Sequence, residues 1–277
     1  MTKEQKKIEQ AFSKSSRILI LLHQCPDGDT IASSLALKEF LVSSGKKVQL
    51  AVNGEIPEVF HFLTGVDEIT NDFLLGDFDL VIAVDCGDIK RTGFPSRLEQ
   101  HCKNKKPLIN IDHHTKNDLH KIAKINLVDQ QAAATAEIVW ELLIALNGEI
   151  SPRIATYILA GIYFDTGGFQ HSNLTEKTLH IASNCLSCGG RMGLVSTRMS
   201  YSKSSSALRL WGMALSKMEL NSDGIAVSYL SLDDIASVGA QADDSSGVVN
   251  LVNSVPSARV AILFVESPDG TIKASLR

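Results

Sequence analysis

Aromatic side chains are scarce in this sequence, and neither sign of charge dominates it. Phe, Trp and Tyr make up 6% of the 277 residues, and 27 basic residues stand against 31 acidic ones, a net charge of -4. Proteins that hold long nucleic acids need a basic surface, and those that hold single strands add aromatic side chains for stacking. The composition therefore argues against a long duplex as partner and leaves open a short anionic substrate.

The sequence also lacks an apolar run long enough to span a bilayer. Its first residues, "MTKEQKKIEQAFSKSS", are polar and amphipathic, without the apolar centre of a secretory signal. Five cysteines are an odd number, and "CLSC" at 185–188 has no second pair to complete a zinc site. We therefore expect a cytoplasmic protein with no membrane partner and no disulfide framework.

Short apolar segments alternate with longer amphipathic ones along most of the chain. Strands are expected at 17–23, 46–52, 79–88 and 107–114, and helices from Thr30, at 134–147 and at 151–169. The strands are apolar along their length rather than on one side only. This pattern predicts an α/β fold with a mainly parallel sheet flanked by helices on both faces.

The composition changes near residue 190. Residues 191–206 are serine-rich without a sustained apolar period, which is typical of a linker. They separate a larger domain, 1–190, from a smaller α/β domain, 207–277, in which we expect a helix, a strand and a final β-hairpin at 258–277. Because the sequence ends inside the last strand of that hairpin, we expect the second domain to be incomplete.

Acidic and imidazole side chains follow three of the predicted strands. They are His23, Asp27 and Asp29 after the first, Asp85 after the third, and Asp112, His113 and His114 after the fourth. The carboxyl ends of parallel strands open onto one crevice, and Asp165 can reach it from the end of a helix. Carboxylates that converge repel one another and are costly to bury, which predicts bound cations. So many oxygen and imidazole ligands indicate a pair of manganese or magnesium ions.

Each motif also has a simpler interpretation. "PDGD" is a common turn sequence, and "DHHT" is typical of a helix cap with solvated histidines. Asp85 and Asp165 can simply end a strand and a helix. The simpler interpretation needs four coincidences in chain order, so we favour the metal site.

The four motifs resemble those of the DHH/DHHA1 phosphoesterase family. "HQCPDGD", "VAVDCGD", "IDHHT" and "YFDTGGF" match the family's motifs in order, and the segment from "DDSSGVVNL" to "TIKASLR" is similar to the first part of the DHHA1 domain. The resemblance covers nearly the whole chain. It is strongest toward a subfamily of oligoribonucleases that also dephosphorylate 3'-phosphoadenosine 5'-phosphate. The family's glycine-rich "GGGH" segment is not found in this sequence.

The resemblance implies a role for each motif residue. The implied ligands of one manganese ion are His23, Asp27 and Asp85, and those of the other are Asp29, Asp85, His113 and Asp165. His114 would face the scissile phosphate, and Asp112 would orient its neighbours. A water activated by the two ions would then attack phosphorus. The candidate substrate-binding residues are His114, Arg91, Arg277, His171 and Asn173.

We therefore expect a manganese-dependent phosphodiesterase that releases nucleoside 5'-monophosphates from short RNA oligonucleotides bound between the two domains. Magnesium is the alternative ion, and a homodimer is an oligomeric state that stays open. Three other functions also stay open: hydrolysis of cyclic di-AMP or its linear dinucleotide, a family II type pyrophosphatase, and a nucleotide-binding module without turnover. The two enzymatic alternatives use the same metal ligands, so the motifs do not separate them.

Overall fold

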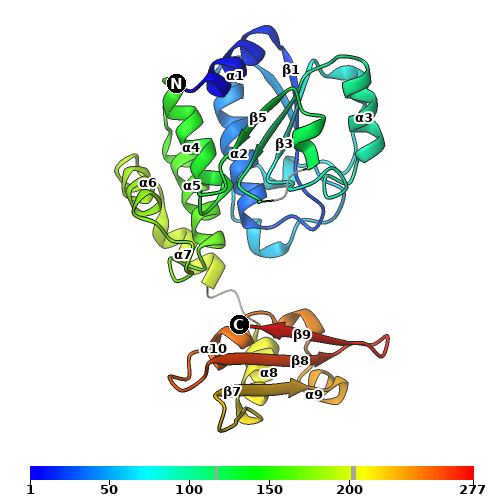
Figure 1. The fold of residues 1–277 in the computed structure, drawn as a ribbon, viewed down its shortest axis with the longest axis vertical. Helices are drawn as coiled ribbons and strands as arrows, with labels where there is room; N and C mark the ends of the chain where they lie inside the picture. Colours follow the sequence, from blue (N-terminus) through cyan, green and yellow to red (C-terminus); the bar gives the residue numbers. More distant parts are fainter. Residues whose placement is uncertain (116–117, 201–203) are drawn as a thin grey trace. The chain divides into compact units, whose positions relative to one another are not determined.

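The structure is a computed structural model that describes residues 1–115, 118–200 and 204–277. Its chain divides into two compact units, residues 1–201 and 202–277 (Figure 1). Each unit has its own sheet and its own apolar core. Within the described residues, no helix is both long and apolar enough to cross a membrane.

Five parallel strands form the sheet of the first unit. In sheet order they are β2 (Lys47–Ala51), β1 (Arg17–Leu21), β3 (Leu80–Val84), β4 (Leu108–Asp112) and β5 (Ile125–Val128). Strands β3 and β4 are buried along their whole length, as expected for a sheet covered on both faces. The predicted α/β fold with a mainly parallel sheet is confirmed.

Helices cover the two faces of this sheet (Figure 1). Helices α1 (Lys3–Lys14), α2 (Gly28–Ser43) and α4 (Thr135–Ala145) share one core with strand residues such as Ile18 and Ile20. Helix α3 (Pro95–Lys103) lies over the other face, where Leu19 and Leu21 point. Helix α5 (Pro152–Asp165) packs against α2 and α4, and α6 (Glu176–Ser187) packs in turn against α5. Short 3₁₀ helices span Glu58–Phe60, Val66–Glu68, Leu75–Asp77 and Asp118–Lys121.

The segment 191–206, predicted as a linker, contains regular structure instead. Residues Met192–Ser200 form helix α7, which packs against α5, and α8 begins at Ser205. The fully buried Val195 anchors α7 to the core of the first unit. The partly buried Met192 and Met199 pack against the same core, but these positions stand among glycine, serine and threonine residues, a composition typical of a linker. Residues 201–203 of the predicted linker lie outside the described residues.

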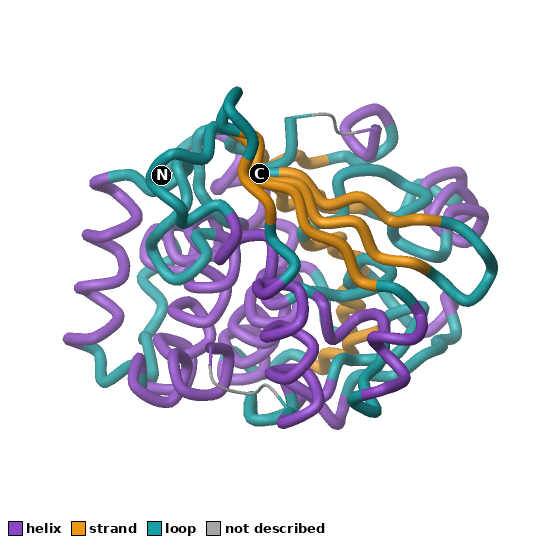
Figure 2. Tube along the Cα trace, turned by 90° about the horizontal axis from the view of Figure 1, so that it is seen from below, coloured by secondary structure: helices purple, strands orange, loops and turns teal. Residues whose placement is uncertain are grey.

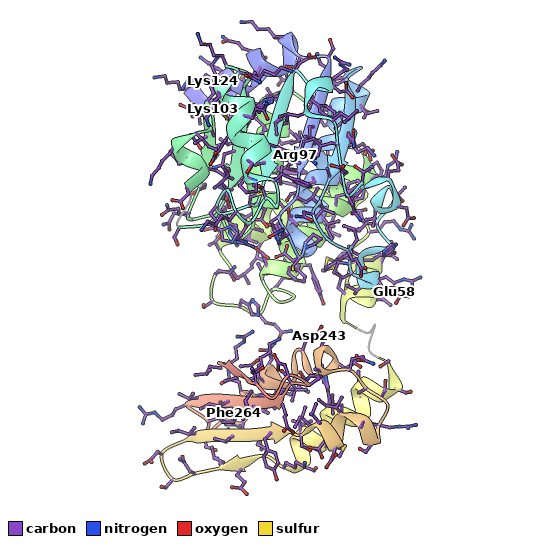
Figure 3. All side chains as sticks on the ribbon, turned by 90° about the vertical axis from the view of Figure 1, so that its right-hand side faces the viewer. Glu58, Arg97, Lys103, Lys124, Asp243 and Phe264 are labelled. Atoms are coloured by element: carbon purple, nitrogen blue, oxygen red, sulfur yellow. The ribbon has the colours of Figure 1, made fainter. Side chains whose placement is uncertain are left out.

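The second unit contains a mixed sheet. Its strands, in sheet order, are β6 (Glu219–Leu220), β7 (Ile225–Leu230), β8 (Val260–Glu266) and β9 (Ile272–Leu276). Strands β7 and β8 are parallel, and β8 and β9 form the predicted antiparallel hairpin (Figure 1). Figure 2 shows the strands of the protein in orange and the helices in purple. The helices are α8 (Ser205–Ser216), α9 (Leu232–Ser237) and α10 (Val248–Val252), with a 3₁₀ turn at Ala242–Ser245. Leu263 of β8 is buried, whereas the neighbouring Phe264, labelled in Figure 3, is 38% exposed on the opposite face.

Candidate metal centre

The turn from β1 to α2 holds three of the predicted ligands. Asp27 is the N-cap of α2, and its Oδ1 accepts the backbone N–H groups of Asp29 and Thr30 over 3.1 and 3.2 Å. Its other oxygen, Oδ2, lies 3.5 Å from Nε2 of His23. A Cβ atom on Gly28 would lie 2.6 Å from Cγ of Phe164, so only glycine lets α5 approach here. The motif "PDGD" therefore combines a helix cap with a close contact between α2 and α5.

Asp85 occupies the turn after β3 and is 2% exposed. Its backbone is left-handed, with φ of +60°, a conformation that aspartate tolerates better than most residues. Its Oδ2 lies 3.8 Å from Nε2 of His23, and its Oδ1 lies 3.6 Å from Nε2 of His113. The two oxygens of Asp85 thus face histidines from two different strands.

Strand β4 ends at Asp112, and His113 and His114 follow it. Nε2 of His113 lies 3.2 Å from Oδ2 of Asp165, the last residue of α5. Nδ1 of His114 lies 2.7 Å from Oδ1 of the fully buried Asp112 and 3.4 Å from Oδ1 of Asp85. Helix α5 therefore brings Asp165 to the carboxyl edge of the sheet, beside the three strand ends.

Backbone carbonyl groups fix the orientation of two imidazoles. Nδ1 of His23 lies 2.7 Å from the carbonyl oxygen of Gln24, and Nδ1 of His113 lies 3.2 Å from that of Ala132. A carbonyl oxygen can only accept, so Nδ1 carries the hydrogen in both rings and the lone pair of Nε2 faces the cluster, where a cation could accept it. Nε2 of His23 is buried and has no hydrogen-bond partner among the described residues.

This arrangement forms three groups of potential ligand atoms, and within each group all the atoms lie within 4.8 Å of one another. They are His23, Asp27 and Asp85; Asp29, His113 and Asp165; and Asp85, His113 and His114. The first group has the composition implied for one ion, and the second contains all the ligands implied for the other ion except Asp85. The structure therefore brings all six predicted metal ligands together at one edge of the sheet.

The negative charges of the clustered aspartates repel one another when no cation is bound. Burial, followed by the charges of Asp29 and Asp27, raises the pKa of Asp165 to about 9. Burial and the charges of the surrounding aspartates, Asp29 foremost, also raise the pKa of Asp85 well above its usual value. The cluster thus resists full ionisation unless positive charge enters it.

The pKa values of Asp29 and Asp27 are shifted in opposite directions. Burial raises the pKa of Asp29, with His113 opposing and Asp27 adding to the rise. Burial also acts on Asp27, but the nearby His23, 3.5 Å away, and the hydrogen bonds from two backbone amides outweigh it, so the pKa falls below the usual value. Carboxylate oxygens beside an unpartnered imidazole nitrogen are the donor set that divalent cations such as manganese prefer. The residues present therefore fit a divalent metal site.

The predicted substrate-binding residues lie in several places. Nη1 of Arg91 lies 3.3 Å from Nε2 of His114, at the edge of the ligand cluster. Nδ1 of His171 lies 3.1 Å from the carbonyl oxygen of Asp165, to which Nδ2 of Asn173 also donates over 3.2 Å. Arg277 lies in the second unit, where its Nε donates to Asn250 over 2.8 Å.

Two further residues contact the cluster that the motifs did not indicate. Oγ1 of Thr135 donates to Oδ1 of Asp85 over 2.8 Å, and Oγ of Ser33 donates to Oδ1 of Asp29 over 3.0 Å. Both hydroxyl groups are buried. Only their positions in the sequence could have indicated these residues. Ser33 lies one helical turn after Asp29, and Thr135 begins the helix that follows the third motif.

The geometry of the site agrees with a comparison against known families. Residues 17–162 match the family described as "DHH family, N-terminal domain". The chain belongs to the DHH family. The predicted family resemblance is therefore confirmed, and all the predicted metal ligands except Asp165 lie within the matched residues.

Two relatives that share one name align with most of the chain. A Thermus thermophilus protein named "Bifunctional oligoribonuclease and PAP phosphatase NrnA" is 31% identical over 262 residues, which span 94% of this chain and 75% of that protein. A Bacillus subtilis protein of the same name is 26% identical over 94% of this chain and 81% of its own length. The chain is thus similar to NrnA proteins through both of its units.

A solved structure has the same fold. It is described as an exopolyphosphatase-related protein from Bacteroides fragilis, with a TM-score of 0.91 and 27% identity. The match covers the whole of this chain and 85% of the other. Both units of the present chain therefore have counterparts in a related protein.

Proposed function

We propose that the chain is a metal-dependent phosphodiesterase that degrades short oligoribonucleotides to nucleoside 5'-monophosphates and also dephosphorylates 3'-phosphoadenosine 5'-phosphate. The observation that carries this proposal is the position of Asp85, whose two oxygens face ligand groups on either side of it. Membership of the DHH family and the names of the T. thermophilus and B. subtilis relatives support a hydrolase with these substrates.

The cofactor that we propose is a pair of manganese ions, with magnesium as the alternative. One ion would be held by His23, Asp27 and Asp85, and the other by Asp29, Asp85, His113 and Asp165. When bound, such a pair lowers the pKa of a coordinated water and neutralises charge on phosphate oxygens. The raised pKa values of Asp85 and Asp165 support this assignment, because added positive charge favours the ionised carboxylates.

The residues around the metal ligands would bind and orient the phosphate. Asp112 holds Nδ1 of His114, which directs the opposite ring nitrogen toward Arg91. A guanidinium group beside an imidazole suits a phosphate oxygen, since both donate charge-assisted hydrogen bonds when the imidazole is protonated. We assign phosphate binding to Arg91 and His114, and the orientation of His114 to Asp112.

The test compares four substrates with and without manganese: a 5'-labelled RNA dinucleotide, 3'-phosphoadenosine 5'-phosphate, cyclic di-AMP and pyrophosphate. We expect the dinucleotide to be cleaved fastest and only with the metal. Asp85→Asn keeps the shape of the side chain and should lower kcat/KM by about 100-fold or more. Replacing a residue that only orients a metal ligand costs up to about 100-fold, and a ligand itself should cost at least as much. The matched control is Asp72→Asn, an exposed aspartate paired with Arg97, which should leave kcat/KM unchanged.

Each other result would replace the proposal with a named alternative. Faster turnover of cyclic di-AMP would indicate a cyclic dinucleotide phosphodiesterase, and faster turnover of pyrophosphate would indicate a pyrophosphatase. A manganese-loaded protein that binds the dinucleotide without releasing product would indicate a binding module. Cleavage that persists in Asp85→Asn would overturn the assignment of the metal ligands.

A further inference from the structure

Thr135 contacts two of the clustered aspartates, and its side chain is fully buried. As the first residue of α4, it donates its backbone N–H to Oδ2 of Asp29 over 2.5 Å. Its hydroxyl group donates to Oδ1 of Asp85 over 2.8 Å. One residue therefore connects a ligand from the first motif with the aspartate that lies between the ligand groups.

The two aspartates depend on Thr135 in different ways. Asp29 also accepts the backbone N–H of Ala136 over 3.0 Å and the hydroxyl of Ser33, so mostly main-chain groups hold it. Among the described residues, the Thr135 hydroxyl is the one hydrogen-bond donor to the Asp85 side chain. A change of the Thr135 side chain should therefore disturb Asp85 and leave Asp29 in place.

We propose that Thr135 is a positioning residue for the metal pair, acting through Asp85. Its hydroxyl group fixes the rotation of the Asp85 carboxylate, so that Oδ1 faces His113 while Oδ2 faces His23. The surrounding aspartates repel this carboxylate, so a fixed donor opposes its rotation away from them. This inference rests on the proposed function, because it concerns the same two ions. Groups that orient metal ligands change metal affinity without touching the metal.

The experiment measures manganese binding to the metal-free protein by calorimetry, beside kcat and KM for the dinucleotide. Thr135→Val removes the hydroxyl with little change of volume, and it should weaken manganese binding by about 10- to 100-fold. Thr135→Ser keeps the hydroxyl and should bind manganese within about threefold of the unchanged protein, because the donor remains. At saturating manganese, KM should be unchanged in both variants, since Thr135 is not assigned to the substrate.

A matched control separates this role from packing. Thr156 of α5 is also a buried threonine, and its hydroxyl donates to Pro152 and accepts from Arg191. Thr156→Val should lower Tm and leave manganese affinity unchanged. Thr135→Ala provides a second hydroxyl-free variant for comparison with Thr135→Ser if the valine variant does not fold.

The outcomes distinguish the two proposals. Weaker binding in Thr135→Val or Thr135→Ala, with normal binding in Thr135→Ser, would support the positioning role. Equal affinities in all Thr135 variants, or the same loss in Thr156→Val, would overturn it while the proposed function stands. An unchanged protein that binds no manganese would overturn the proposed function, and the positioning role with it.

Discussion

Oδ1 of Asp112 accepts two hydrogen bonds from His114, one from Nδ1 over 2.7 Å and one from the backbone N–H over 3.0 Å. Its other oxygen accepts the backbone N–H of Gly87 over 2.6 Å. Burial opposes ionisation of Asp112, but these bonds and the attraction of His114 outweigh it, so its pKa lies below the usual value. Asp112 thus ties the turn after β4 to the turn after β3.

Asp112→Asn should therefore misorient His114 without removing a metal ligand. An amide that keeps its oxygen toward Gly87 presents its NH₂ group to the two donors of His114, which cannot bond to it. We expect kcat/KM for the dinucleotide to fall by about 10- to 100-fold, with manganese affinity unchanged. The check is a double-mutant cycle with His114→Ala. Additive losses would contradict a role of Asp112 through His114.

Arg91 should contribute to substrate affinity. Its guanidinium group lies beside His114 and can bind a phosphate oxygen through two donors, which lysine cannot reproduce. Arg91→Lys and Arg91→Met should both raise KM for the dinucleotide by about tenfold or more, the loss of a charge-assisted hydrogen bond. Arg97→Met is the control, because Arg97, labelled in Figure 3, pairs with the exposed Asp72. A KM that stays unchanged in both Arg91 variants would exclude Arg91 from the phosphate site.

The metal-free protein should lose stability as the pH rises. The folded-state pKa of Asp165, about 9, exceeds that of an unfolded aspartate, so the folded state binds this proton more tightly. The resulting stability is complete below the unfolded pKa, near 4, and is lost as the pH rises toward about 9. Tm of the metal-free protein should fall over this range, and saturating manganese should reduce the fall.

Asp165→Asn tests this explanation directly. In the metal-free protein, Asp165→Asn should raise Tm at about pH 8 to 9, because the asparagine removes the cost of ionising the buried carboxyl group. Near pH 4, where that group keeps its proton, the substitution should change Tm little. Saturating manganese should raise the Tm of Asp165→Asn by less than it raises the Tm of the unchanged protein, because the variant lacks one proposed metal ligand. Parallel pH profiles for the metal-free variant and the unchanged protein would contradict the assigned pKa.

The second unit offers a prediction that is independent of the metal site. Nζ of Lys217 lies 2.6 Å from both oxygens of Asp234, which also closes the capping box of α9 with Ser231. Asp234→Ala removes both contacts and should destabilise this unit by about 0.5–2 kcal/mol, the range for lost helix caps. The measurement is urea unfolding followed by Trp211 fluorescence in a Trp140→Phe background. Asp233→Ala, an exposed neighbour, should have little effect, and equal losses would contradict the explanation.

The sequence predicts the parallel sheet well because its interior strands are mostly apolar on both faces. It does not predict β5, since "INLV" at 125–128 is only four residues long and includes Asn126. The side-chain amide of Asn110 on β4 donates to Asn126 over 3.3 Å, a contact between strands that no local pattern reveals. Helix α7 is missed because the polar, serine-rich composition around it outweighs its three apolar contacts, Met192, Val195 and Met199.

The candidate metal ligands are predictable because each lies in or beside a turn that follows a strand or helix, and parallel strands end at the same edge of a sheet. The partners of these ligands are not predictable in this way. The side-chain amide of Asn173, for example, donates to the carbonyl oxygens of Ala133 and Asp165. Such bonds depend on how α4 and α5 pack together, which residue spacing does not record.

The hydrogen bond between Thr135 and Asp29 joins residues 106 positions apart in the chain. A growing polypeptide exposes His23, Asp27 and Asp29 long before Thr135 and Asp165 have been synthesised. During that interval Asp29 lacks its backbone donors from Thr135 and Ala136, and the early ligands lack their partners from the later strands. Metal capture at this site is therefore expected to follow the folding of the sheet rather than to begin it, so the finished fold selects the ion.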